Sequence, residues 1–261
     1  MIRKLMKYDL KKMTNLLIYL YPITILMAGI TRLINLGKEI QLIFIIGQIF
    51  AGITYSLVAN ILVNTFVQIL TTFNRSFYKD ESYLTHTLPV SKKQLIASKY
   101  LSALTVIFAS VLVSVVSLII VLYTNELGEM LKAFINLTVS GMNISTGAFI
   151  TIIVVLLFAQ ICCMISMAFT VIIKANTYQE KRILKGLGWF AALYLGIGAI
   201  TLVLGILMAA ITGDFSSVFA QVIPASLLIN LIILAGVLYL LYSILFYLAC
   251  NKLFGKGVNV D

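Results

Sequence analysis

Long, continuously apolar segments alternate with short polar connections along this chain. Six of them stand out, roughly at 16–34, 42–72, 97–123, 147–173, 187–211 and 222–249. A helix needs about 20 mostly apolar residues to cross the hydrocarbon core of a bilayer, whereas membrane β-strands alternate apolar and polar residues over about ten positions. The pattern therefore predicts an all-α integral membrane protein with six transmembrane helices, organised as one domain over residues 1–261.

The first residues, "MIRKLMKYDLKKMTN", have a helical period of apolar positions. One face collects Ile2, Leu5, Met6, Leu10 and Met13, and the basic side chains lie mostly elsewhere. Such a distribution is typical of a helix that lies in the membrane interface. We therefore predict an N-terminal interfacial amphipathic helix, with an ordinary basic flank of the first span as the alternative.

A polar stretch, "FYKDESYLTHTLPVSKKQL", separates the second and third apolar segments. Pro89 disfavours helix at the residue before it, and Ser91 followed by Gln94 has the form of a capping box. A new helix should therefore begin near Lys92 and run on into the third span. The upstream "YKDESYLTHT" is long enough for about two helical turns, with Tyr78 and Leu84 or Leu88 as apolar anchors. The pattern predicts a short helix below the membrane, and a solvated loop is the alternative.

The second apolar segment carries three carboxamides, Asn60, Asn64 and Gln68, at intervals of four residues. Together they cover only about 80° of a helix surface. Carboxamides cannot face lipid cheaply, because each has donors and acceptors to satisfy. We expect them to point at another helix, a partner subunit or a wetted path. Small residues in the third and fifth segments predict helix packing: Ser110, Ser114, Ser117, Ala192, Gly196 and Gly198.

Composition and charge support a membrane protein. The chain is 61% hydrophobic and 11% charged, with a formal net charge of +10. The basic residues gather on one side of the predicted spans: Arg3, Lys4, Lys7, Lys11, Lys12, Arg75, Lys79, Lys92, Lys93, Lys99, Lys174, Lys181, Arg182, Lys185, Lys252 and Lys256. The opposite side keeps only Arg32, Lys38 and Lys132. Because Lys and Arg near span ends stay in the cytoplasm, both termini and the polar stretch should face it. The charge then indicates topology and contact with membrane lipids, and no nucleic-acid partner.

The chemistry that the sequence lacks also matters. No ionisable residue lies in the middle of a predicted span, and this argues against a proton-coupled carrier. Cys162, Cys163 and Cys250 lie in or at the end of predicted spans, where they are expected to pack as small apolar residues. Neither "GKEI" at Gly37 nor "GKGV" at Gly255 completes a phosphate-binding P-loop. We therefore predict no catalytic residue, no metal site and no cofactor bound by this chain.

The segment "FYKDESYLTHTLPVSKKQLIASKYLSAL" resembles the cytoplasmic loop of bacterial type-2 ABC exporter permeases. The similarity rests on Asp80 and Glu81, on "TLPVS" at 87–91 and on "SKYL" at 98–101. The start "LMKYDLKK" resembles the N-terminal interfacial helix of that family. The resemblance extends in outline to the whole chain, with six spans and internal termini. It identifies a family and says nothing of the substrate.

The resemblance implies a two-component exporter in the bacterial cell membrane. Two permease subunits, identical or paralogous, would pair with a cytoplasmic ABC ATPase dimer that holds ATP and Mg. The polar stretch would be the ATPase-coupling helix, through Tyr78, Asp80, Glu81, Tyr83, Leu84, Leu88 and Pro89. Asn60, Asn64 and Gln68 would lie at the translocation path or the subunit interface. The family often has a re-entrant hairpin between its last two spans, where this chain has a short connection.

Substrate and class stay open at this point. An antimicrobial peptide, a lipid or a drug would each suit spans without charge. Two alternatives also remain: a non-transport polytopic membrane scaffold or sensor, and an ion-coupled secondary carrier. A scaffold would need no ATPase, and a carrier would run on an ion gradient alone.

Overall fold

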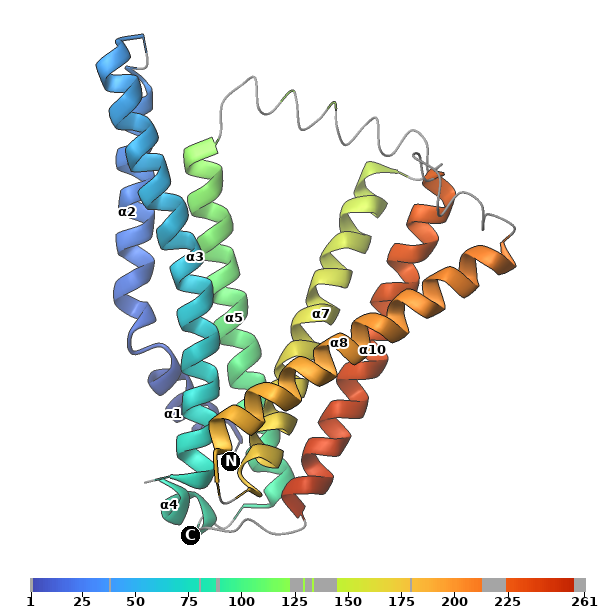
Figure 1. Ribbon diagram of the computed structural model, residues 1–261. Helices are drawn as coiled ribbons and strands as arrows, with labels where there is room; N and C mark the ends of the chain where they lie inside the picture. The colour runs from blue at the N-terminus through green and yellow to red at the C-terminus, as the bar shows by residue number, and fades with distance from the viewer. Residues whose placement is uncertain are drawn as a thin grey trace. The chain divides into compact units, whose positions relative to one another are not determined.

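The computed structural model describes residues 2–37, 39–79, 81–87, 90–122, 129, 133, 145–178, 180–212 and 224–255. Within these ranges the side chains of Ile2, Leu84, Thr85, His86 and Ala225 are outside the description. The regular elements of the described part are helices (Figure 1): α1 (Ile2–Met13), α2 (Leu17–Asn35), α3 (Gln41–Tyr78), α4 (Ser82–Thr87), α5 (Lys92–Leu122), α7 (Thr146–Ala175), α8 (Arg182–Ile211) and α10 (Ala225–Gly255).

Six helices in the described part are long and apolar enough to cross a membrane: α2, α3, α5, α7, α8 and α10. The described part is therefore all-helical, as predicted, and its six apolar helices support a multi-pass membrane protein, while the interfacial and coupling roles of the two short helices stay predictions. Several helices extend beyond the apolar segments that predicted them. The apolar pattern marks only the apolar stretch of each helix, whereas backbone hydrogen bonding can continue into polar residues.

The helices belong to two compact units. Unit 1 contains α1 to α5, and unit 2 contains α7, α8 and α10. In unit 1, α2, α3 and α5 all pack against one another, and α1 packs on α5 and α3. The prediction that residues 1–261 act as one domain stays a prediction.

Hydroxyl groups join the spanning helices of unit 1. The Ser110 hydroxyl on α5 lies 2.7 Å from the Tyr21 hydroxyl on α2 and 2.6 Å from that of Thr65 on α3. A second buried pair joins Thr31 on α2 to Thr54 on α3 at 2.9 Å. Polar bonds of this kind hold membrane helices together, since lipid offers no hydrophobic drive for helix association.

The connection from α3 to α5 agrees in part with the sequence prediction. The backbone N–H of Ser91 donates to Gln94 Oε1 and that of Gln94 donates to Ser91 Oγ, both at 3.4 Å. This capping box and the start of α5 at Lys92 are confirmed. Tyr78, however, ends α3 instead of anchoring the short helix. Phe73 and Phe77 are fully buried with their rings edge to face, and this packing extends α3 to that point.

Unit 2 is built on α7, which packs against α10 and α8. Cys163, Met167 and Val171 of α7 form a buried cluster with Ile197 of α8. All three cysteines are buried free thiols, in agreement with a packing role. The expectation of close helix approach at Gly196 and Gly198 is wrong within this unit. A Cβ at either position would meet nothing within 4 Å, because larger side chains of α8, such as Trp189, make the contacts.

Candidate functional site

A buried ion pair joins the N-terminal helix to the third spanning helix. The Lys99 ammonium on α5 bonds to Asp9 Oδ1 on α1, and the two side chains are only 7% and 9% exposed. Ser98 Oγ donates to the second oxygen of Asp9 at 3.1 Å, and Lys99 Nζ also donates to Ser76 Oγ on α3 at 2.8 Å. Both charges are thus paired and hydrogen-bonded, as buried charges must be.

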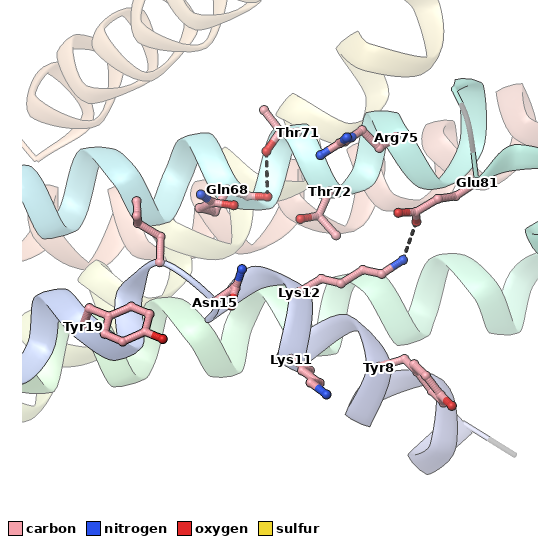
Figure 2. Close-up of a pocket in the computed structure, with 11 residues that line it drawn as sticks. Tyr8, Lys11, Lys12, Asn15, Tyr19, Gln68, Thr71, Thr72, Arg75 and Glu81 are labelled. Carbon is pink, nitrogen blue, oxygen red and sulfur yellow. Dashed lines mark hydrogen bonds and ion pairs between the residues drawn. The ribbon is translucent and has the colours of Figure 1, made fainter.

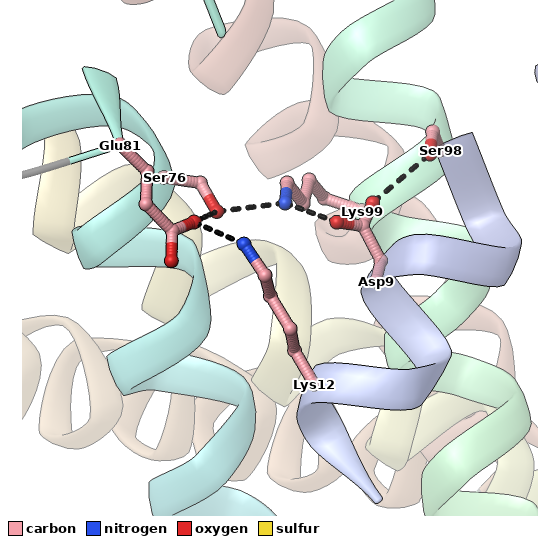
Figure 3. A network of polar contacts seen from close by, with 6 residues as sticks. All are labelled: Asp9, Lys12, Ser76, Glu81, Ser98 and Lys99. Carbon is pink, nitrogen blue, oxygen red and sulfur yellow. Dashed lines mark hydrogen bonds and ion pairs between the residues drawn. The ribbon is translucent and has the colours of Figure 1, made fainter. Parts of the chain in front are cut away.

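The network continues to the polar connection between α3 and α4 (Figure 3). Lys12 of α1 forms an ion pair with Glu81 at 2.5 Å, and Ser76 Oγ lies 3.5 Å from the same Glu81 oxygen. The hydrogen bond from Lys12 lowers the pKa of Glu81, more strongly than its partial burial raises it. This outer pair is partly exposed, at 46% and 33%, and so contributes less than the buried one.

The sequence of α1 explains why this helix turns one face inward. Asp9 and Met13 are four residues apart and both are buried, so they share the face that packs on unit 1. Asp9 is the only acid in α1, and it lies next to apolar positions rather than among the lysines. Sequence reasoning missed both Asp9 and Lys99. The signal available was an acid on the apolar face of an otherwise basic helix.

A pocket of about 670 Å³ opens beside this network, between α1, the start of α2 and the end of α3 (Figure 2). Asn15 and Lys12 extend from the α1–α2 side toward the α3 wall. Its lining is mainly polar, aromatic and basic: Tyr8, Lys11, Lys12, Asn15, Leu16, Tyr19, Gln68, Thr71, Thr72, Arg75 and Glu81. Glu81 is the only acid among these residues.

The residues predicted to couple to an ATPase differ in where they lie and in how exposed they are. Glu81 faces α1 through Lys12, whereas Tyr83 on α4 is 76% exposed. Leu84 has its backbone in α4, but its side chain is outside the described residues. Asp80, Leu88 and Pro89 also lie outside the described residues. A docking role for this segment stays a prediction.

The predicted carboxamide face lies on the outer surface of unit 1. Asn60 is exposed, and Asn64 and Gln68 are half-buried. Asn64 Nδ2 donates to the Asn60 carbonyl at 3.0 Å and to the Asn60 side-chain oxygen, so these two bond along α3. Buried Ile61 and Thr65 mark the inward face of α3, which lies beside the carboxamide face and about 80° from it. A role of these carboxamides at a translocation path or a subunit interface stays a prediction.

Among the described residues, no three His, Cys, Asp or Glu side chains lie together as metal ligands would. No protein-family model, curated protein or solved structure matches the chain. Function must therefore be inferred from the residues of this chain and from the resemblance carried by its polar stretch.

Proposed function

We propose that the chain is the membrane-spanning permease subunit of an ATP-driven ABC exporter whose ATPase is a separate cytoplasmic chain. The observation that carries the proposal is α4, a short helix between two long apolar helices, with Tyr83 76% exposed on its surface. The capping box at Ser91 joins this connection directly to α5. The resemblance of residues 77–104 to the cytoplasmic loop of such permeases supports the same role.

The charged network supports a mechanical role for the connection. A displacement of α4 by an ATPase would reach α5 through the backbone at Ser91. It would reach α1 through the ion pair between Glu81 and Lys12. Since Asp9 and Lys99 in turn hold α1 on α5, the connection and the two helices would move together. Glu81 then acts by joining α4 to α1, and Tyr83 acts at the ATPase surface.

A second permease subunit would cover the carboxamide face. Asn60 and Asn64 bond to each other along α3, yet their remaining donors and acceptors need polar partners at membrane depth. A second copy, or a paralogue, supplies such partners across a subunit interface or along a water-filled path. The exported compound would be an antimicrobial peptide, a lipid or a drug, and both termini would face the cytoplasm.

Co-purification from native membranes tests the proposal. The tagged chain should bring down a P-loop ATPase in stoichiometric amount, identified by mass spectrometry. Tyr83→Ala should abolish that association, because an exposed aromatic residue is a common anchor of an interface. Tyr55→Ala is the matched control, since Tyr55 is 42% exposed but lies on a spanning helix.

Two results would overturn the proposal. The first is a chain that purifies without an ATPase, in a detergent that preserves a known ABC complex. Reconstituted transport driven by an ion gradient would then favour the carrier, and its absence the scaffold. The second is ATPase association that Tyr83→Ala and Tyr55→Ala reduce equally, which would remove the docking role of α4.

A further inference from the structure

The lengths of α3 and α2 indicate that the pocket beside α1 lies near the membrane surface. α3 has 38 residues and is therefore about 57 Å long, well beyond the hydrocarbon thickness of about 30 Å. Its lining residues, Gln68 to Arg75, come from the last turns, beyond the length that lipid tails can cover. On the other wall, α2 has 19 residues, enough for about one bilayer crossing, and the lining ends near its first turn. Phospholipid headgroups occupy this depth.

The pocket carries an excess of positive charge. Lys11, Lys12 and Arg75 line it, against the single carboxylate of Glu81. That carboxylate already bonds to Lys12. In the described part of the chain, neither Lys11 nor Arg75 forms an ion pair. Two cations are therefore available to an anion that enters from the membrane surface.

The remaining lining suits a ligand with a polar head and apolar tails. Asn15 and Gln68 supply neutral hydrogen-bonding groups, whereas the Thr71 hydroxyl already donates to the carbonyls of Val67 and Gln68. Leu16 and Tyr19 are 43% and 68% exposed at the rim, where acyl chains would begin. Tyrosine is enriched at this depth because its ring sits in the apolar layer while its hydroxyl reaches water.

We propose that this pocket binds a phosphate-bearing anion, and specifically the headgroup of an anionic phospholipid. Arg75 can donate two parallel hydrogen bonds to phosphate oxygens, and Lys11 adds a point charge. Basic pockets between spanning helices at a membrane surface are known to hold anionic headgroups. The inference is independent of the exporter proposal, because it needs only a membrane and the described residues of unit 1.

Binding would also act on the network. A phosphate within reach of Lys12 competes with Glu81 for the same ammonium, and this weakens the ion pair between α1 and the α3–α4 connection. The lipid would thus loosen a contact that holds the polar connection in place. A disulfide between cysteines introduced in α1 and α4, with Lys12 and Glu81 both kept, should accordingly form more slowly in anionic than in zwitterionic bilayers.

A titration of the full chain in neutral detergent tests the site. Dioctanoyl phosphatidylglycerol should bind with measurable affinity. Dioctanoyl phosphatidylcholine should bind more weakly, by at least about fivefold for each basic side chain of the pocket that contacts the anionic headgroup. Lys11→Gln with Arg75→Gln should weaken phosphatidylglycerol binding by about fivefold per charge removed. The matched control is Lys4→Gln with Lys7→Gln, which removes the same charge from exposed positions of α1 outside the pocket.

The outcomes separate the possible sources of the anion. Equal losses in both double variants would mean diffuse attraction to a basic helix and would overturn the site. So would equal affinity for the two lipids. If glycerol phosphate binds as tightly as phosphatidylglycerol and displaces it, the phosphate site stands and the lipid assignment falls. Thermal unfolding of both variants shows whether a loss of binding reflects a loss of folding instead.

Discussion

The ammonium of Lys99 and the carboxylate of Asp9 are paired between α5 and α1, with each side chain almost fully buried. Ninety residues separate them in sequence. Each charge lost most of its hydration when α1 packed on α5. The opposite charge and the hydroxyl groups of Ser98 and Ser76 replace the lost contacts with water. The position of α1 on unit 1 therefore depends on a charge pair as well as on apolar contact.

Removing one member of this pair should lower the free energy of unfolding far more than removing both. Asp9→Leu or Lys99→Met alone leaves a buried charge without its partner, which typically costs about 3–5 kcal/mol. The double variant Asp9→Leu with Lys99→Met removes both charges and should restore most of that stability. Unfolding in mixed micelles by sodium dodecyl sulfate measures the three free energies. Additive losses in the double variant would show that the two side chains act independently.

The ion pair of Lys12 and Glu81 allows a charge exchange. If Glu81 acts by joining the polar connection to α1, Glu81→Lys should break the contact, and Lys12→Glu with Glu81→Lys should restore it. Crosslinking between cysteines introduced in α1 and α4 reports the contact, and ATPase co-purification reports the function. Should the exchange restore crosslinking while association stays lost, Glu81 must touch the ATPase directly.

The pH dependence of this outer pair follows from its pKa. The Lys12 hydrogen bond lowers the pKa of Glu81 in the folded chain, below the usual value of about 4.3. Its contribution to stability is therefore complete above that usual value and is lost as the pH falls through the lower, folded pKa. Because the pair is partly exposed, the contribution is at most about 1 kcal/mol.

A carboxyl ¹³C titration of glutamate-labelled chain, assigned with Glu81→Gln, checks this prediction. Lys12→Met should move the Glu81 pKa up toward its usual value. The stability difference between wild type and Glu81→Gln should stay constant from about pH 6 to 8. If Lys12→Met leaves the Glu81 pKa unchanged, the pair does not form in solution.

The sequence was enough to predict the elements that local physics controls. Lipid forces every backbone group to be satisfied within a segment, so long apolar runs could only be helices. The capping box at Ser91 and Gln94 is equally local, because both partners lie within one turn. The extension of α3 to Tyr78 was missed, since it follows from the burial of Phe73 and Phe77 against other helices.

The site was less accessible from sequence. Glu81 stood out as polar, but nothing near it indicated Lys12 as its partner. Lys99 was interpreted as one more topology charge near the start of a span, and Asp9 was not singled out within the predicted interfacial helix. Their pairing depends on how α1 folds back onto α5, and a helical period fixes only which residues share a face. Contacts between helices that are distant in sequence do not appear as a period in the pattern of apolar residues.

Two serines on α5 offer a final comparison. Ser110 and Ser117 are both fully buried, yet only Ser110 bonds to other helices, through the hydroxyls of Tyr21 and Thr65. The Ser117 hydroxyl has no hydrogen-bond partner in the described part of the chain. Ser110→Ala should therefore lower the free energy of unfolding by about 0.6 kcal/mol for each bond lost, the average measured in membranes, where the maximum is about 1.7 kcal/mol. Ser117→Ala removes the same atom without breaking a bond, so it should be neutral or slightly stabilising. Unfolding in mixed micelles compares the free energies of the two variants. Equal losses would mean that the hydroxyl groups of Ser110, Tyr21 and Thr65 do not hold the three helices together.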